Sequence, residues 1–499
     1  METSTINTKQ LYASQNETAQ DENLLTNYIH QINSLSFEIA LSAGLWRIKV
    51  ISNTIQKAGK VNPLSFFVLT GTFLLMITSG IVVYALQPDF SQFNADRMKS
   101  TFGFTFLIIA GLLLLFKVAF FIYNLFLYFK YKPVESVSDE LLPTCTIIVP
   151  AYNEGNLVYE TLLSIANSDY PKEKIQLLAI DDGSKDDTWY WMQEAKKLLG
   201  DRLSIYQQPK NMGKRHALYR GFNLGTGDIF VTIDSDSIVK ADTLRNLVSP
   251  FAVNEKCGAV AGNVQVLNNQ KALLPKMLNV SFVMSFEFVR SAESMLGSVL
   301  CTPGALAAYR SSAVFECLPE WINQTFMGQP SDIGEDRAMT NMILKQGFQV
   351  LFQKNAYVLT NVPENYSGLY KMFIRWDRSN VRENIMMAKY VFTNFRNESK
   401  FGARLLFLNQ SFKIIMSFPF LFFMIFFIVM HPILFFSSTI FSILIISSFP
   451  VLFYARRYNA SESFWAYSYS LLYTFGLFWI TPYAIATASR RGWLTRGLS

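Results

Sequence analysis

The sequence of 499 residues is poor in charge and in cysteine. Charged residues make up only 16% of it, and no run of lysine and arginine suited to a phosphate backbone occurs, so nucleic-acid binding is not expected despite the net charge of +7. The four cysteines are unevenly spaced and form no CxxC pair, so the sequence implies neither a zinc site nor a disulfide framework. The amino terminus lacks the basic-then-apolar pattern of a cleavable signal peptide.

Apolar residues, in contrast, make up 51% of the chain. Charge is concentrated between about residues 131 and 400, which indicates a soluble domain between membrane segments. Basic pairs flank the apolar runs, as they do at the cytoplasmic ends of membrane helices: Lys130 and Lys132, Arg456 and Arg457, Arg490 and Arg491.

We therefore divide the chain into six parts. They are a cytoplasmic amino-terminal region with an amphipathic helix (1–62), two transmembrane helices (63–130), a cytoplasmic α/β domain (131–365), interfacial helices (366–410), two transmembrane helices (411–456), and an interfacial or re-entrant segment with a cytoplasmic tail (457–499). This arrangement predicts a multi-pass protein of the cytoplasmic membrane.

Three features of these parts allow alternatives. The helix expected between Leu24 and Ile39 either lies on the membrane surface or packs on the soluble domain. Lys117, inside the second span, either snorkels toward the cytoplasm or faces a polar pathway. We expect Phe464–Ala488 not to cross the bilayer, because one more crossing would place the last arginines outside.

Between the membrane segments, short β-rich stretches alternate with stretches of helical length. The strands expected are TCTIIVP, QLLAIDD, RLSIYQQ, DIFVTIDSD and AVAGNVQVL. This alternation predicts a mostly parallel sheet with helices on both faces. Ligands of such sheets bind at the carboxyl ends of the strands.

Carboxylates gather at two of these strand ends, at Asp181-Asp182 and at Asp234 and Asp236. Either cluster alone is explained equally by a loop or a helix cap. Together they predict a site for a nucleotide diphosphate, which approaches carboxylates only through a divalent cation such as Mg²⁺ or Mn²⁺. We expect Asp236 to bind the metal, Asp234 to lie near the metal or the ribose, and Asp181 to contact the base.

Two further motifs carry charge that suits the same chemistry. Lys214 and Arg215 in NMGKR can contact a diphosphate, although a solvated helix start explains them as well. In GEDR, Asp336 is the candidate general base for an acceptor hydroxyl, with Glu335 beside it, and a helix cap is the alternative.

A third motif follows at Arg375 and Trp376. The arginine can neutralise a leaving diphosphate and the tryptophan can stack on a sugar ring. The structural alternative is an interfacial pair that anchors a helix to lipid.

The motifs VPAYNEG, DDGS, NMGKR, DSD, PGALAAYR, GEDRAMTNMILKQGF and RWDRSNVRE occur in this order. From about residue 60 onward the chain therefore resembles the membrane-integrated family 2 glycosyltransferases, above all hyaluronan synthases and chitin-oligosaccharide synthases. The resemblance implies an α/β nucleotide-diphospho-sugar transferase domain and an inverting, metal-dependent hexosyltransferase that uses a UDP-sugar. It also implies that UDP-GlcNAc is a donor and that a β-linked polymer leaves through the membrane helices.

The same resemblance implies further site residues. Tyr152, Glu154 and Asp182 would join the donor site. Trp493 and Arg496 resemble a short motif near the end of the membrane region and would lie near the active site. The acceptor site would include Trp376 and four residues around PGALAAYR: Cys301, Gly304, Tyr309 and Arg310.

This chain departs from the family pattern at several positions. Met372 replaces a glutamine and Leu494 a glycine, and the additional spanning helices of larger hyaluronan synthases do not follow Ser499. Acceptor handling is therefore expected to differ, and export to use an accessory partner or a differently assembled path.

Three hypotheses follow from the sequence. The first is a processive polysaccharide synthase that couples extension to export. The second is a transferase that adds a single sugar to a membrane lipid. The third is a non-catalytic membrane scaffold. Such a scaffold would be expected to have lost at least one of the three carboxylate clusters, but all three are present: Asp181-Asp182, Asp234 with Asp236, and Glu335-Asp336.

Overall fold

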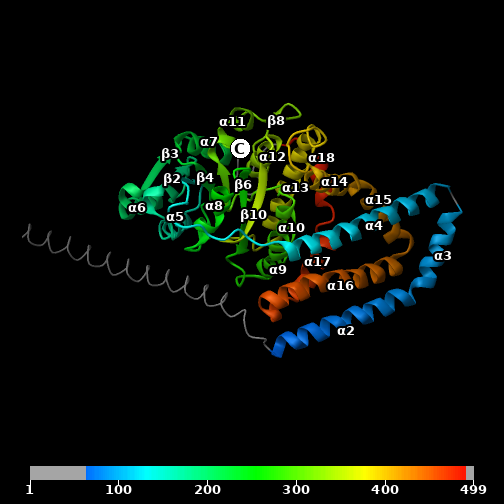
Figure 1. Cartoon of the computed structure of the whole chain (residues 1–499). Coiled ribbons are helices and arrows are strands. Elements are labelled where there is room, and N and C mark those ends of the chain that lie inside the picture. The colour runs from blue at the N-terminus through cyan, green and yellow to red at the C-terminus, as the bar shows by residue number, and fades with distance from the viewer. Residues whose placement is uncertain (1–62, 100, 491–499) are drawn as a thin grey trace, which may run out of the picture.

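The computed structural model describes residues 63–99 and 101–490 of the chain. The helix predicted between Leu24 and Ile39 lies outside these residues, as do Leu494 and the pair Trp493 and Arg496. Figure 1 shows an α/β domain at one end of the molecule and long helices at the other.

The α/β domain is built on eight strands. They are β1 (Cys145–Ala151), β2 (Ile175–Asp181), β3 (Leu203–Gln207), β4 (Ile229–Thr232), β5 (Ser237–Val239), β6 (Cys257–Val266), β7 (Ala307–Arg310) and β10 (Gln349–Thr360), in the spatial order β3-β2-β1-β4-β7-β6-β10-β5. Neighbours from β3 to β4 are parallel, as are β6 and β10, whereas β7 and β5 run antiparallel to their neighbours. A separate two-stranded sheet joins β8 (Thr325–Phe326) and β9 (Gln329–Pro330).

Helices cover both faces of the sheet because the strands are apolar on both sides. Adjacent residues Ile147 and Ile148 of β1 belong to different hydrophobic cores, since successive side chains of a strand point to opposite faces. One core receives α5 (Leu157–Ala166), α6 (Thr188–Leu199) and α8 (Thr243–Val253). The other receives α7 (Lys214–Leu224), α11 (Ser311–Ile322) and α12 (Glu335–Lys345). The predicted α/β fold class is confirmed.

Two helical segments lie between the sheet and the long helices. Between β6 and β7 the chain forms α9 (Leu273–Phe282), the π-helical turn η3 (Val283–Val289) and α10 (Arg290–Met295). After β10 follows α13 (Tyr366–Ala388), whose first turn is capped by the side chain of Asn365.

Three of the described helices are long and apolar enough to cross a membrane: α2 (Pro63–Ala85), α4 (Thr101–Lys130) and α16 (Pro432–Arg457). A polar helix, α3 (Gln87–Met98), connects the first two. Figure 1 shows α2, α4 and α16 grouped at the end of the molecule away from β3, and α2 packs along α16.

The predicted pair of spanning helices over 411–456 differs in its first member. The helix α15 (Ser417–Met430) has 14 residues and rises only about 21 Å, less than the hydrocarbon core. It reaches spanning length only with α14 (Phe401–Ile415), from which it is bent by 43°. The boundary predicted at 410 therefore falls inside α14, while the break expected at His431-Pro432 is where α16 begins.

The final apolar segment contains no long helix within the described residues. It consists of α17 (Trp465–Leu471), a π-helical turn (Leu472–Gly476) and α18 (Ile480–Ala486), preceded by a 3-10 turn at Ala460–Glu462. These short helices pack against α9, α13 and α16. The prediction that this segment does not cross the bilayer stays a prediction.

Lys117 makes a polar contact between helices. Its ammonium nitrogen donates to Oδ1 of Asn409 on α14 at 2.7 Å. The side chain is therefore directed at a neighbouring helix, which favours the polar alternative over snorkelling.

Candidate active site

The carboxyl ends of β1, β2 and β4 meet at one edge of the sheet, where they open into a cavity of about 810 Å³. Because these strands are parallel and adjacent, the residues that follow them converge. Five predicted site residues line the cavity from these strand ends: Tyr152, Glu154, Asp182, Asp234 and Asp236.

Asp181 and Asp182 lie in different surroundings although they are adjacent. The carboxylate of Asp181 is fully buried and accepts hydrogen bonds from Ser184 and from Nε2 of Gln207. Asp181 does not line the cavity, and the base contact predicted for it stays a prediction.

Asp182 reaches the cavity and also holds the NMGKR loop. Its carboxylate accepts the backbone N–H groups of Met212 at 2.9 Å and Gly213 at 2.7 Å. Burial raises the pKa of Asp182 to about 6, against the opposing effect of these N–H donors. Gly213 has a φ of +94°, which favours glycine where the loop turns into α7.

Lys214 and Arg215 begin α7 but point in different directions. Lys214 lines the cavity, where its ammonium pairs with Asp234 and lies 3.3 Å from Oε1 of Glu335. Burial alone would lower the pKa of Lys214, but the two carboxylates outweigh it and raise this pKa.

Arg215 lies behind the cavity rather than in it. Its side chain is buried, donates to the carbonyl oxygen of Trp321, and donates to Oε1 of Gln324 at 3.1 Å. The diphosphate contact predicted for Arg215 is therefore corrected. Successive residues of a helix point about 100° apart, so Lys214 faces the strand ends and Arg215 does not.

Asp336 lies in the first turn of α12, which begins after Gly334 with a φ of +78°. Its Oδ2 accepts the backbone N–H of Gly304 at 3.1 Å, and its Oδ1 accepts that of Arg337 at 2.7 Å. Burial and the neighbouring Glu335 raise the pKa of Asp336, while Lys214 and Arg337 act against this rise. Both Glu335 and Asp336 line the cavity.

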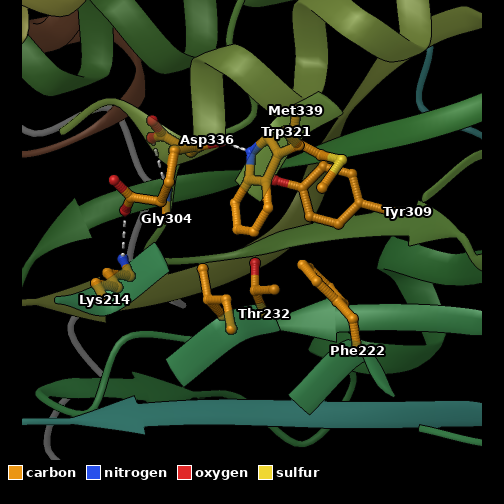
Figure 2. Close-up of a pocket in the computed structure, with 10 residues that line it drawn as sticks. Lys214, Phe222, Thr232, Gly304, Tyr309, Trp321, Asp336 and Met339 are labelled. Atoms are coloured by element: carbon orange, nitrogen blue, oxygen red, sulfur yellow. Dashed lines mark hydrogen bonds and ion pairs between the residues drawn. The ribbon is translucent and has the colours of Figure 1, made fainter. Parts of the chain in front are cut away.

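A small side pocket extends from Asp336 into the core beneath it. Figure 2 shows Lys214 and Asp336 at one end of this pocket and Tyr309 and Phe222 at the other. The indole N–H of Trp321 donates to the carbonyl oxygen of Glu335 at 2.9 Å, which ties the start of α12 to α11.

The four residues predicted around PGALAAYR separate in the structure. Cys301 and Gly304 line the cavity, and burial raises the pKa of the Cys301 thiol to about 11. Tyr309 lines only the side pocket, where its hydroxyl lies 2.9 Å from Oγ1 of Thr302.

Arg310 lies at the opposite edge of the sheet. It pairs in register with Ile229, the first residue of β4, because β7 runs antiparallel to β4. Its Nε donates to the carbonyl oxygen of Cys257 at 3.0 Å. The acceptor role predicted for Arg310 is therefore corrected, since the strand direction carries its side chain away from the cavity.

The helix α13 supplies Arg375 and Trp376 to the other side of the cavity. The Trp376 ring is 37% exposed and meets Phe373 edge to face, with 5.5 Å between ring centroids. Met372, which replaces the family glutamine, lines the same wall and is buried.

A sequence profile described as "Glycosyltransferase like family 2" matches residues 143–379, the region that contributes most of this cavity. These residues form a family 2 glycosyltransferase domain.

Several curated proteins share this domain. An N-acetylglucosaminyltransferase of Rhizobium meliloti (strain 1021) is 33% identical over 253 residues, which cover 50% of this chain and 59% of that protein. A hyaluronan synthase of Streptococcus pyogenes is 30% identical over 282 residues, which cover 56% of this chain and 66% of that protein. The chain thus spans less than two thirds of the length of these relatives.

Among solved structures, a mannosyltransferase from Pyrobaculum calidifontis in complex with GDP-Man and Mn2+ is 20% identical to this chain, with a TM-score of 0.47. The similarity covers 73% of this chain and 98% of that one.

The carboxylates of the glycosyltransferase domain fit a divalent cation only together with a donor. Within residues 63–99 and 101–490, no group of three or more histidine, cysteine, aspartate or glutamate side chains is arranged to hold a metal. Asp234 and Asp236 nevertheless line one cavity, and Mg²⁺ is commonly held by one or two carboxylates plus substrate phosphates.

Three polar residues where α13, α14 and α18 meet were not identified from the sequence. The carboxylate of Asp377 accepts from Nζ of Lys413 at 3.2 Å and from Oγ1 of Thr481 at 2.6 Å. Asp377 follows Trp376 in the motif RWDRSNVRE. Lys413 and Thr481 are distant in sequence and belong to none of the motifs identified above. Asp377 and Lys413 also line the cavity.

Proposed function

We propose that the chain is an inverting, metal-dependent glycosyltransferase that transfers GlcNAc from UDP-GlcNAc to a growing β-linked glycan and feeds the product into the membrane. Glucuronate is a second candidate sugar. One observation carries the proposal: a single cavity is lined by the carboxylates of the strand ends, by Asp336, and by Trp376.

The strand-end side of the cavity suits the donor. Asp182, Tyr152 and Glu154 line this side and would contact the nucleoside, and Lys214 can share its ammonium with a phosphate oxygen. Asp236 and Asp234 would hold Mg²⁺ or Mn²⁺, which neutralises the diphosphate and so makes it a better leaving group.

The start of α12 suits the transfer step. The Asp336 carboxylate accepts the proton of the acceptor hydroxyl as its oxygen attacks the anomeric carbon, and the bond from that carbon to the diphosphate breaks on the opposite face. This geometry inverts the anomeric configuration, so an α-linked donor gives a β-linked product. Arg375, on the facing helix, can stabilise the charge of the departing UDP.

The side of the cavity toward the membrane suits a glycan. Aromatic rings of Trp376, Phe373 and Tyr473 line it, and sugar rings stack on such faces. Ile480 of α18 and Lys413 of α14 complete this wall. A product extended here enters the protein between the helices that we propose to span the cytoplasmic membrane, with the catalytic domain (131–365) in the cytoplasm.

The proposed spans number up to four within the described residues. An accessory partner for export accordingly remains part of the proposal. The alternative of a single sugar added to a membrane lipid uses the same donor site, but the three aromatic rings on one side of the cavity favour a growing glycan as the acceptor. The scaffold alternative is disfavoured because the carboxylates from three motifs converge on one cavity.

The test is transfer by the purified full-length protein. We expect UDP release with Mn²⁺ and UDP-GlcNAc, alone or paired with UDP-glucuronate, and a product that chitinase or hyaluronidase degrades. Asp336→Asn, measured in parallel, controls for contaminating transferases. UDP release with UDP-glucose only would refute the donor assignment, and a product found solely in the lipid extract would refute polymer synthesis.

A further inference from the structure

The π-helical turn η3 forms one wall of the cavity. Ser285 and Phe286 in this turn line the cavity, as does Arg290 directly after it. The Arg290 guanidinium lies 4.3 Å from the centroid of the Phe286 ring and donates to the carbonyl oxygen of Cys301 at 2.6 Å. π-Helical turns are rare and occur frequently at functional sites.

The carboxyl-terminal end of α16 holds this turn from the side away from the cavity. Glu287, the next residue of η3, is only 2% exposed and turns away from the cavity. Its Oε1 lies 2.8 Å from Nε of Arg457, the last residue of α16, and its Oε2 accepts the hydroxyl of Tyr458 at 2.6 Å.

Arg457 is itself fixed from several sides. Its guanidinium lies 5.7 Å from the ring centroid of Tyr128 on α4 and 5.6 Å from that of Phe453 on α16. Arg456, the preceding basic residue of the pair that marks this helix end, is exposed instead. The two arginines are adjacent in the sequence, but only Arg457 pairs with the buried Glu287.

We propose that Glu287 and Arg457 are positioning residues that fix the η3 wall of the cavity to α16 and thereby control how long the growing glycan is retained. A buried carboxylate that loses its cationic partner is strongly destabilised, so η3 shifts when the pair is broken. This inference rests on the proposed function, because retention matters only if the cavity holds a glycan between additions.

Product length follows from a competition between the next addition and release of the glycan. Loosening Phe286 raises the release rate, whereas donor binding and the Asp336 site are formed by other elements. Breaking the pair is therefore expected to shorten the product without slowing the individual transfer step.

The experiment compares Arg457→Gln with its neighbour Arg456→Gln in the purified full-length protein. Both remove one positive charge from the same helix end, so any effect on topology or net charge is shared. For Arg457→Gln we expect mean product length to fall at least about threefold, with initial UDP release and donor KM within about twofold of wild type. Arg456→Gln should give wild-type lengths.

Tyr458→Phe removes only the hydroxyl that Glu287 accepts and should also shorten the product. This variant decides the inference if size-exclusion chromatography shows that Arg457→Gln is misfolded. If Arg457→Gln folds, product lengths equal to those of Arg456→Gln would overturn the inference. If it does not fold, product lengths of Tyr458→Phe equal to those of wild type would overturn it.

If the wild-type protein adds only one sugar, the proposed processive function fails separately. The inference is then decided by the KM for a short glycan acceptor. It predicts a rise of at least about threefold in Arg457→Gln at unchanged donor KM, and an unchanged acceptor KM would overturn it.

Discussion

The guanidinium of Arg215 lies 4.9 Å from the centroid of the Trp321 ring and donates a hydrogen bond to the carbonyl oxygen of the same residue. Trp321 in turn donates to Glu335, immediately before Asp336. Gln324, which accepts from Arg215, donates to the buried carboxylate of Glu383 on α13 at 2.8 Å. Arg215 thus supports the turn that carries the proposed base.

Exchanging either residue of the Lys214-Arg215 pair for methionine should separate donor binding from positioning. We expect Arg215→Met to lower kcat by about 10- to 100-fold, because a displaced base is costly, while the UDP dissociation constant stays within about twofold. Lys214→Met should weaken UDP binding. Calorimetric UDP binding and UDP release measure the two effects, and equal loss of UDP binding in both variants would restore a donor role for Arg215.

Asp336→Asn should lower transfer by about 10²- to 10⁴-fold, because the amide cannot accept the hydroxyl proton. UDP binding should be nearly unchanged, since the donor contacts come from the strand ends. The measurement is initial UDP release at saturating donor, with UDP affinity as the internal control. Turnover within tenfold of wild type would remove Asp336 from the role of base.

The pH dependence of kcat/KM should show the raised pKa of Asp336. Only the ionised carboxylate accepts a proton, so activity is present above this pKa and is lost as the pH falls through it. Because burial and Glu335 raise the pKa, the acidic limb should lie above the value near 4 of an ordinary aspartate. An acidic limb at or below pH 4, measured at constant metal concentration, would contradict this prediction.

Chelation should stop transfer, and added Mn²⁺ or Mg²⁺ should restore it, because the diphosphate would otherwise face the carboxylates of Asp234 and Asp236 directly. Asp236→Ala should not be rescued by metal at any concentration. Asp201→Ala, which changes a fully exposed aspartate, is the matched control and should behave as wild type. Full activity in EDTA would exclude the metal site.

Gly334→Ala should destabilise the protein more than Gly328→Ala, although both glycines have a positive φ, of +78° and +76°. A Cβ at Gly334 would lie 2.0 Å from Oγ of Ser379, whereas one at Gly328 would meet nothing within 4 Å. Backbone strain costs about 1–2 kcal/mol in each, and overpacking adds roughly 1–3 kcal/mol at Gly334. Thermal unfolding in detergent should therefore rank Gly334→Ala lowest, and equal Tm values would contradict the close packing of α12 on α13.

Part of the site was predictable because it depends on local order along the chain. A buried apolar strand followed directly by acidic residues predicted that Asp234 and Asp236 stand at a strand end. The rule for parallel sheets then predicted that such ends meet. The helix cap that was the alternative interpretation of GEDR likewise located the start of α12.

The remaining residues could not be placed in this way. Asp182 lines the cavity and its neighbour Asp181 does not, although both are buried. Arg215 differs from Lys214 by one step around a helix. The sequence alone therefore assigned all four residues to the donor. Arg310 was misplaced because β7 is inserted antiparallel between β4 and β6, and strand direction depends on pairing with distant segments.

The sequence by itself determined the class of domain, the apolar helices and the carboxylates at the strand ends, because periodicity and turn chemistry act between near neighbours in the chain. Only the tertiary structure decided which charges face the cavity and which support it from behind. The contact between Glu287 and Tyr458 joins residues 171 positions apart. Such pairs form because burying an unpaired charge is costly, so the partner comes from whichever segment the fold places beside it. Local sequence patterns do not identify that segment.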